Sequence, residues 1–248
     1  MARRVEIRVG CCGFQMSRPA YFERFRLTEV QQTFYQPPQL KTLERWRAEA
    51  PSDFEFTIKA WQLITHSPAS PTYRRLREPI HEASRHLYGR FQLSEPVLAA
   101  WETTLACARA LRARVIVFQC PASFTPTDEN VSNLRAFFRR IRRDRRCLLC
   151  GWEPRGDWPA DLIADLVDEL DLLYIVDPFA RSTLEGQSTY YFRLHGKPGT
   201  GYRYSYDDAE LRRLLSWCRR TSYVLFNNVT MVADAQRFLA LLPPPGQR

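Results

Sequence analysis

The chain alternates short apolar runs with amphipathic stretches along most of its length. Eight of the runs have the length and composition of β-strands, and helical patterns separate most of them. This alternation is typical of parallel sheets whose strands are connected by helices. We expect strands at 7–13, 29–35, 54–61, 114–121, 148–155, 173–178, 190–196 and 223–228, and helices at 38–50, 96–111, 131–143, 159–170, 207–218 and 231–242.

Eight strands within 248 residues favour a closed barrel over an open sheet. The first strand is not followed by a glycine-rich phosphate loop, which argues against a dinucleotide-binding fold. Two intervals are irregular. Strands six and seven begin too close together for a crossover helix, whereas residues 66–95 leave room for extra helical structure or a flap between strands three and four. The sequence therefore predicts an α/β fold, a single (β/α)8 TIM barrel that occupies residues 1–248 as one domain.

Composition limits the environment and the partners that we expect. The formal net charge is +9, which permits a polyanionic partner without requiring one. The sequence has no apolar segment of the roughly 20 residues that span a membrane and no apolar leader after Met1, so we expect a cytoplasmic protein without a membrane partner. The seven cysteines are irregularly spaced and are expected to be reduced thiols. The sequence makes no prediction of the oligomeric state.

Side chains two residues apart share one face of a strand, which predicts the direction of each side chain. In the third strand, one row is apolar and the other is polar. We expect the apolar row to pack against helices and the polar row to face the barrel axis, with Lys59 nearest the carboxyl end. The two rows are Phe54, Phe56 and Ile58, and Glu55, Thr57 and Lys59.

Polar side chains recur near the carboxyl ends of the other strands. A second strand at 29–35 places Glu29 in one row with Gln31, Thr33 and Tyr35. In the seventh strand Arg193 and His195 share a row with Tyr191. The remaining members of the polar set are Gln119, Glu153, Arg155, Asp177, Asn227 and Asn228, of which either asparagine can point inward.

Charged groups inside a barrel are costly unless they are paired or used. Pairing is one interpretation: Glu153 with Arg155 or Arg193, and Glu29 or Glu55 with Lys59. Taken together, however, the polar residues converge on the end of the barrel where enzymes with this fold place their sites. The set as a whole therefore predicts a ligand site.

The segments that carry these residues resemble, in order and over nearly the whole chain, the motifs of the DUF72 or YecE-like family. Three positions depart from the family pattern: Cys12, Phe14 and Gln31 stand where the family has Ser, Trp and Asn. The matching segments are 10–14, 29–35, 54–60 with Thr65-His66, 117–124, Glu153-Pro154-Arg155 with Trp158, 191–196, Tyr202 with Tyr204, and 226–228.

The resemblance implies a TIM barrel with its site at these positions, and it adds His66, Tyr202 and Tyr204 to the candidate binding residues. The two tyrosines either stack on a ring of the ligand or anchor a loop. The family has no settled activity. Its structures have been likened in shape to TIM-barrel endonucleases that cut at apurinic sites, and a likeness of shape does not establish chemistry.

The candidate residues suggest hydrolysis of an anionic substrate. Lys59, Arg155 and Arg193 can bind a phosphate or a carboxylate, the arginines as bidentate donors and the lysine as a point charge. Glu153 and His195 can then serve as base and acid, with Asp177 orienting one of them. We hypothesise an enzyme that hydrolyses a phosphate-bearing or sugar-like substrate and needs no cofactor.

A metal centre is the weaker alternative. The chain has four histidines, and His81 and His86 lie away from the strand ends. Glu153, Asp177 and His195 remain as possible ligands for one ion, but we expect no metal. Cys147 and Cys150 are three residues apart on an expected strand and point to opposite faces, so we interpret them as structural.

The strongest charge run, residues 135–146, offers a second functional class. Its apolar positions recur at helical spacing, so we expect its arginines to coat the solvated outer face of a helix. The run ends near the start of the fifth strand. The alternative is a barrel that binds nucleic acid, either noncatalytically or as an endonuclease on damaged DNA, with phosphate contacts from Arg139, Arg140, Arg142 and Arg143.

Overall fold

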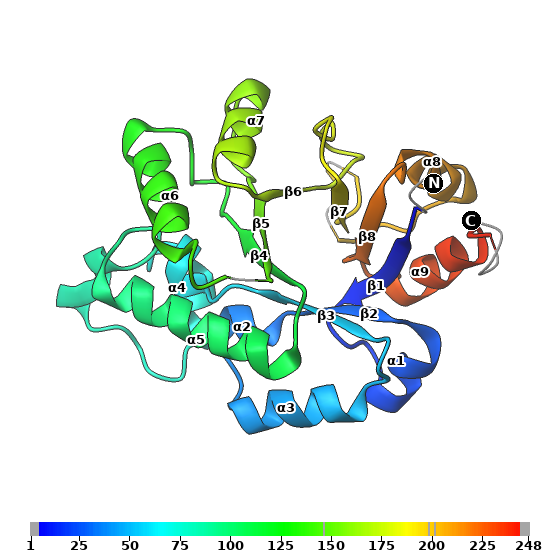
Figure 1. The fold of residues 1–248 in the computed structure, drawn as a ribbon, viewed down its shortest axis with the longest axis horizontal. Helices are drawn as coiled ribbons and strands as arrows, with labels where there is room; N and C mark the ends of the chain where they lie inside the picture. The colour runs from blue at the N-terminus through cyan, green and yellow to red at the C-terminus, as the bar shows by residue number, and fades with distance from the viewer. Residues whose placement is uncertain (1–4, 146, 198, 201, 244–248) are drawn as a thin grey trace. The chain divides into compact units, whose positions relative to one another are not determined.

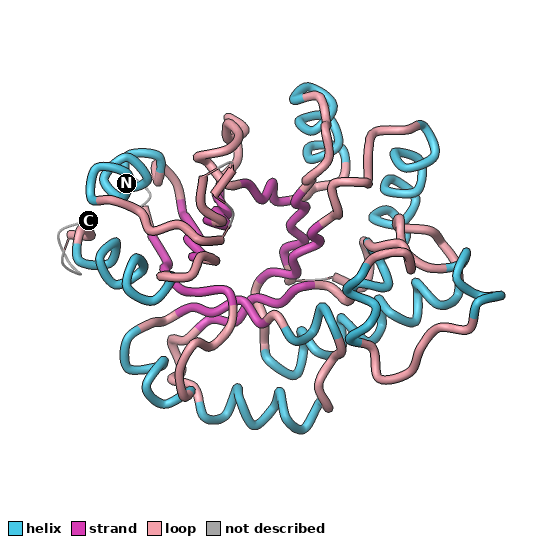
Figure 2. Tube along the Cα trace, turned by 180° about the vertical axis from the view of Figure 1, so that it is seen from behind, coloured by secondary structure: helices cyan, strands magenta, loops and turns pink. Residues whose placement is uncertain are grey.

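The computed structural model describes residues 5–145, 147–197, 199–200 and 202–243. Its strands follow one another in the order β1 to β8 of a closed barrel, and helices connect most of them (Figure 1). Figure 2 shows the same alternation of helix and strand along the chain. The predicted (β/α)8 TIM barrel of the α/β class is confirmed.

The regular elements begin and end close to the predicted positions in most of the chain. The strands are β1 Ile7–Cys12, β2 Leu27–Val30, β3 Glu55–Lys59, β4 Val115–Gln119, β5 Leu149–Glu153, β6 Leu173–Val176, β7 Thr189–Leu194 and β8 Thr221–Phe226. The helices are α1 Arg18–Arg24, α2 Gln32–Tyr35, α3 Leu40–Glu49, α4 Gln62–Thr65, α5 Glu95–Leu111, α6 Asp128–Ile141, α7 Ala160–Glu169, α8 Asp208–Trp217 and α9 Met231–Ala240.

The prediction of a strand at 29–35 is wrong beyond Val30. The chain turns there into the short helix α2, so Glu29, Thr33 and Tyr35 do not form one row. The hydroxyl of Thr33 donates to the carbonyls of Val30 at 3.1 Å and Lys59 at 2.7 Å, which satisfies backbone groups that a continuing strand would have used. The short helices α1 and α4 are also absent from the prediction.

Both irregular intervals are confirmed. Two 3₁₀ helices, η1 Pro71–Arg75 and η2 Glu82–Leu87, lie between β3 and β4. Residues 177–188, all of which are described, connect β6 to β7 without a helix.

The chain divides into two compact units. Unit 1 comprises Met1–Glu29, Ala50–Glu55 and Leu173–Arg248, and unit 2 comprises Val30–Glu49 and Phe56–Leu172. The assignment of residues 1–248 to a single domain stays a prediction.

In unit 1 the strands β1, β2, β6, β7 and β8 supply the framework. β1 pairs in parallel with β2 and β8, and β7 pairs in parallel with β6 and β8. Helix α9 lies against β1 and β8 (Figure 1). Aromatic contacts join helices to strands: Phe22 of α1 meets Phe54 at 4.8 Å, and Phe238 of α9 meets Phe226 at 6.0 Å between ring centroids.

In unit 2 three strands stand in parallel register, with β4 between β3 and β5. The outer face of β4 is aromatic: the ring of Phe118 lies 5.0 Å from Phe138 of α6 and 6.1 Å from Trp101 of α5. Helix α6 buries the apolar positions that the sequence assigned to its inner face, Leu134, Phe137, Phe138 and Ile141. The helix begins at Asp128, before the predicted position 131, where the Thr127 hydroxyl caps it by accepting a hydrogen bond from the Asn130 backbone N–H.

The expected alternation in β3 is confirmed by its register. Lys59 pairs with Val117, and Gln119 pairs with Glu153. Paired residues on adjacent parallel strands point to the same face, as do residues two apart. Lys59, Gln119 and Glu153 therefore share the face opposite the aromatic helix-packing row.

None of the helices in the described part of the chain has the length and apolar character needed to cross a membrane.

Candidate functional site

The predicted site residues are divided between the two units. Unit 1 holds Glu29, Asp177, Arg193, His195, Tyr202, Tyr204, Asn227 and Asn228, and unit 2 holds Lys59, His66, Gln119, Glu153 and Arg155. The expectation that Lys59, Glu153, Arg193 and His195 face one cavity stays a prediction.

The most deeply buried charges of unit 1 are Glu29 and Arg193. Arg193 donates from Nε to Glu29 Oε2 at 3.0 Å and from its terminal nitrogen to Oε1 at 2.8 Å, and both side chains have 0% exposure. The hydroxyl of Tyr191 adds a hydrogen bond of 2.9 Å to Oε2. Glu29 thus forms a bidentate ion pair with Arg193, a partner that the sequence did not suggest for it. The roles of both residues toward a substrate stay predictions.

A second charged layer in unit 1 lies nearer the start of the strands. Glu55 of β3 forms an ion pair with Arg8 of β1 and accepts a hydrogen bond of 2.9 Å from Tyr223 of β8. The Tyr223 ring stacks on Tyr191 at 5.5 Å. The stacked rings of Tyr191 and Tyr223 thus join the two layers. Glu55 pairs with Arg8 in the second layer.

His195 is held on two sides within unit 1. Its backbone N–H donates to Asp177 Oδ2 at 2.8 Å, and its Nδ1 lies 3.0 Å from the amide nitrogen of Asn227. Because an amide NH₂ only donates, Nδ1 is the acceptor in this contact. Asp177 contacts His195 through the backbone N–H, and its role in orienting a catalytic group stays a prediction.

The two asparagines after β8 have different surroundings. Asn227 contacts the His195 ring, whereas Asn228 is buried and donates to the Tyr204 carbonyl and to Asp234 Oδ2, both at 2.7 Å. Asp234 is itself 1% exposed. The asparagine that meets His195 is therefore Asn227, whereas Asn228 ties the loop at Tyr204, before α8, to helix α9.

The two tyrosines after β7 also differ. Tyr204 donates to Glu210 at 2.6 Å, with the Lys197 ammonium 5.3 Å from its ring, which is the loop-anchor position. Partial burial and the bond to Glu210 raise the pKa of Tyr204. Tyr202 is 51% exposed and presents its ring to His195 at 5.8 Å. Tyr202 thus remains the better candidate for contact with a ligand.

In unit 2, Phe34 of α2 brings Lys59 and His66 together. The Lys59 ammonium lies 3.8 Å from the centre of the Phe34 ring, within cation–π range, and the His66 ring lies 4.9 Å from the same ring. Lys59 is 4% exposed and His66 5% exposed. Phe34 is missing from the predicted site because the wrong strand assignment gave it no role there.

The electrostatic environment of His66 is strongly positive. Burial, followed by the charges of Lys59 and Arg155, lowers the pKa of His66 from 6.5 to about 3. Its Nδ1 lies 2.7 Å from the hydroxyl of Thr65. His66 is therefore a neutral, hydrogen-bonded imidazole near pH 7 and does not supply a titrating group there.

Glu153 and Arg155 form the ion pair that the sequence offered as one alternative. Arg155 Nε donates to Glu153 Oε1 at 3.1 Å, with the arginine side chain 29% exposed and the glutamate 6%. Gln119 stands beside Glu153 in the register of β4 and β5. On the opposite face, Trp152 packs on Trp158 at 5.0 Å. The carboxyl ends of these strands thus present a polar face over an aromatic core.

Among the described residues, no group of three or more His, Cys, Asp or Glu is arranged to hold a metal ion. All seven cysteines are free thiols. Cys147 is exposed and Cys150 buried, and burial raises the pKa of the Cys150 thiol to about 12. Their different exposure agrees with the interpretation that the pair does not converge on one ion.

Two residues of the unit 1 group escaped the sequence-based set. Tyr191 bonds Glu29, and Cys12 Sγ lies 3.7 Å from Glu29 Oε1. The alternation that placed Tyr191 in one row with Arg193 was the signal for the first. Cys12 shares a row with Gly10 on β1, but a small thiol gives no polar signal of its own.

The strand order and the polar strand ends define a barrel protein of the (β/α)8 class. The chain belongs to the DUF72 family, "Protein of unknown function DUF72", whose family model matches residues 15–247. None of the curated proteins matches the chain.

Solved structures support the fold. A DUF72 family protein from Enterococcus faecalis V583 is 19% identical, with a TM-score of 0.71 over 96% of this chain and 98% of that one. A DUF72 family protein from Thermotoga maritima MSB8 is also 19% identical, with a TM-score of 0.60 over 95% and 98%. A xylose isomerase domain containing protein from Salmonella typhimurium LT2 is 14% identical, with a TM-score of 0.60 over 96% and 97%. At these identities the likeness extends to the fold alone.

Proposed function

We propose that this protein is a hydrolase that acts on an anionic, phosphate-bearing or sugar-like substrate at the carboxyl ends of its barrel strands. The supporting observation lies in unit 2, where Lys59, Gln119 and Glu153 occupy the carboxyl ends of three adjacent parallel strands on one face. Arg155 lies two residues after Glu153. TIM-barrel enzymes place their active sites at this end of the strands.

The anionic character of the substrate rests on Lys59 and Arg155. Both cations act on His66, and their charges lower its pKa in addition to the effect of burial. Two cations close to one buried group make the local potential positive, and a positive potential favours an anionic ligand. Arg155 supplies bidentate donors and Lys59 a point charge for a phosphate or carboxylate.

Glu153 is the general base of this proposal. Hydrolysis of a phosphate monoester joins a water oxygen to phosphorus, breaks the bond from phosphorus to the alcohol oxygen, and moves one proton from water to the alcohol. Glu153 takes the proton of the attacking water, and the neighbouring cations stabilise charge that develops on the phosphoryl oxygens. The role of His195 as proton donor, with Asp177 as its positioning residue, stays a prediction.

A binding experiment tests the anion site. We expect the Kd of inorganic phosphate, measured by calorimetry at low salt, to rise roughly tenfold in Lys59→Met, because one charge-assisted contact is lost. Lys41→Met is the matched control, since Lys41 is an exposed lysine of α3 in the same unit. Equal affinity in wild type, Lys59→Met and Lys41→Met contradicts the assignment of Lys59.

A turnover experiment tests the reaction. Phosphate release is measured over a panel of phosphate monoesters and sugar phosphates. We expect Glu153→Gln to lower kcat by roughly a hundredfold or more on any substrate found, the range for loss of a general base. Glu82→Gln, at an exposed glutamate of η2, should leave kcat unchanged. Full turnover by Glu153→Gln rejects the mechanism.

A further inference from the structure

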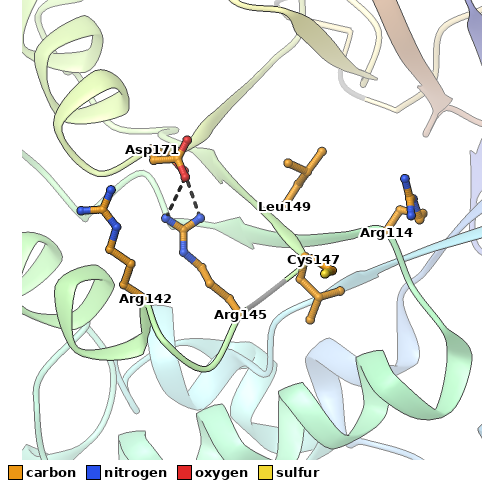
Figure 3. A pocket seen from close by; sticks show the side chains of 7 residues that line it. Arg114, Arg142, Arg145, Cys147, Leu149 and Asp171 are labelled. Atoms are coloured by element: carbon orange, nitrogen blue, oxygen red, sulfur yellow. Dashed lines mark hydrogen bonds and ion pairs between the residues drawn. The ribbon is translucent and has the colours of Figure 1, made fainter.

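A cavity of about 430 Å³ opens at the amino ends of β4 and β5, in unit 2. It lies at the opposite end of these strands from Gln119 and Glu153. Figure 3 shows its labelled side chains, with Cys147 and Leu149 between Arg145 and Arg114. The lining residues are Arg114, Arg142, Arg145, Cys147, Leu148, Leu149 and Asp171.

The arginines of the α6 segment fall into two groups. Arg135 and Arg139 both pair with Glu169, at 2.8 and 2.6 Å, and Arg140 lies 3.7 Å from Asp144. Within the described ranges, no carboxylate pairs with the guanidinium of Arg142, at the end of this helix, or with that of Arg114, before β4. Arg142 and Arg114 both line the cavity, whereas Arg143, which likewise has no carboxylate partner within the described ranges, does not, and Arg146 lies outside the described residues.

The third arginine of the cavity is fixed in place. Arg145 is 6% exposed and donates to the carbonyls of Asp171 at 3.0 Å and Leu170 at 2.9 Å. Its carboxylate partner, Asp171, is 3.4 Å away with a side chain that is 80% exposed. The cavity lining thus contains three guanidiniums and one carboxylate, which pairs with Arg145, and this buried arginine holds its charge at a defined position before any ligand arrives.

An apolar wall accompanies these charges. Leu149 is 46% exposed, one of the few large apolar side chains in the described structure with such exposure, and Leu148 is half-buried beside it. The volume falls within the range of roughly 300–1,000 Å³ that small-molecule sites occupy. A cationic end beside an apolar wall suits a ligand that is itself divided into an anionic and an apolar part.

We propose that this cavity binds a small organic phosphate, with the phosphate group against Arg142 and Arg145 and the apolar part against Leu149, which lies between Arg145 and Arg114 (Figure 3). Guanidinium groups match phosphate oxygens with paired donors, and the single carboxylate is already engaged with Arg145. The ligand favoured here is a small molecule because the volume is that of a small-molecule site, and because Glu169 and Asp144 pair with Arg135, Arg139 and Arg140 on the helix face, which leaves fewer open cations for an extended polyphosphate chain.

The exposed thiol of Cys147 provides a reporter inside the cavity. The other six cysteines are buried, so a brief reaction with iodoacetamide, which is uncharged, should label Cys147 first. The probe is phenyl phosphate, which combines a phosphate with an aromatic ring. We expect saturating phenyl phosphate to slow the alkylation of Cys147 at least about threefold, and the concentration dependence of this protection gives the Kd of the cavity, separately from any binding at the proposed catalytic site.

Matched variants decide the assignment. Arg142→Ala should weaken the protection of Cys147 by phenyl phosphate roughly tenfold, the loss expected for a charge-assisted hydrogen bond, and Arg114→Ala should weaken it less, because Arg114 lies on the other side of Leu149. Arg139→Ala removes the same charge from α6 outside the cavity and should leave this protection unchanged. Lys59→Met should also leave the protection of Cys147 unchanged, because the thiol reports on this cavity and not on the proposed catalytic site.

Three results would overturn the proposal. Absence of protection of Cys147 shows that the cavity holds no organic phosphate. Equal protection in wild type and Arg142→Ala places the binding elsewhere. Protection by a 20-residue oligothymidylate with none by phenyl phosphate identifies the surface as one for nucleic acid.

Discussion

Both units bury charged side chains, but in different surroundings. In unit 1, Glu29 and Arg193 are fully buried and joined by two hydrogen bonds, with a third from Tyr191 to the glutamate. In unit 2, Lys59 and Arg155 both lower the pKa of the His66 imidazole, and Arg155 also pairs with Glu153. A fully buried bidentate pair is expected of a structural element, whereas charges that shift the pKa of a neighbouring group at the carboxyl ends of barrel strands are expected of a functional site.

The largest expected effect is loss of stability when the unit 1 pair is broken. Arg193→Met leaves the Glu29 carboxylate buried without its bidentate partner, and such changes cost about 3–5 kcal/mol. The free energy of unfolding, measured by urea denaturation at pH 7, should fall by that amount. The double variant Glu29→Gln/Arg193→Met removes both charges and should recover part of the loss. A loss below about 1 kcal/mol in Arg193→Met would contradict a structural role for the pair.

The next effect is a pH dependence that arises in unit 2. The folded pKa of His66, about 3, is lowered from 6.5, so between these values the unfolded chain binds a proton that the folded protein does not. His66 therefore destabilises the protein as the pH falls from about 6.5 to about 3, by roughly 1.4 kcal/mol for each pH unit.

The measurement compares two histidine variants. The free energy of unfolding of His66→Gln should fall less steeply than that of wild type between pH 6.5 and pH 4.5, because the variant lacks the group with the lowered pKa. His86→Gln, at an exposed histidine of η2, should follow the wild-type slope. Identical slopes for all three proteins would show that His66 is not held neutral by its surroundings.

A smaller effect separates the contribution of nearby charges to the lowered pKa of His66 from the contribution of burial. Lys59→Met removes one of the two cations that lower this pKa, so the pKa of His66 should rise, while burial and Arg155 still keep it below 6.5. A titration of the imidazole by NMR measures the change, with Lys41→Met as the control. An unchanged pKa in Lys59→Met would remove Lys59 from the electrostatic description of the cluster.

The smallest effects are expected at exposed ion pairs, in both units alike. Asp53→Asn in unit 1 breaks the pair with Arg26, and Glu82→Gln in unit 2 breaks the pair with Arg85, with the two carboxylates 67% and 83% exposed. Exposed pairs contribute roughly 0–1 kcal/mol, so both variants should unfold within about 1 kcal/mol of wild type. A larger loss of unfolding free energy in either variant would mean that the exposure of an ion pair does not indicate how much the pair stabilises this protein.

Much of the fold was predictable because it depends on periodic patterns. Alternation placed Phe56 among the helix contacts, where the Arg47 guanidinium now lies 5.2 Å from its ring, and placed Lys59 on the other face. The same rule failed at 29–35, where a polar and aromatic segment resembles a strand. The hydroxyl of Thr33 binds two backbone carbonyls and ends the strand there, and no period in the sequence records that contact.

The sequence by itself determined the strand order of a parallel barrel and the polar face at the strand ends, because side-chain direction in a strand is a local property. The sequence also suggested the ion pair between Glu153 and Arg155, which are two residues apart. Only the tertiary structure decided that Arg193 takes Glu29, that Asn227 and not Asn228 meets His195, and that Arg142 and Arg114 line one cavity. These choices join residues far apart in the chain, and their partners are selected by distance and burial, which local patterns do not encode.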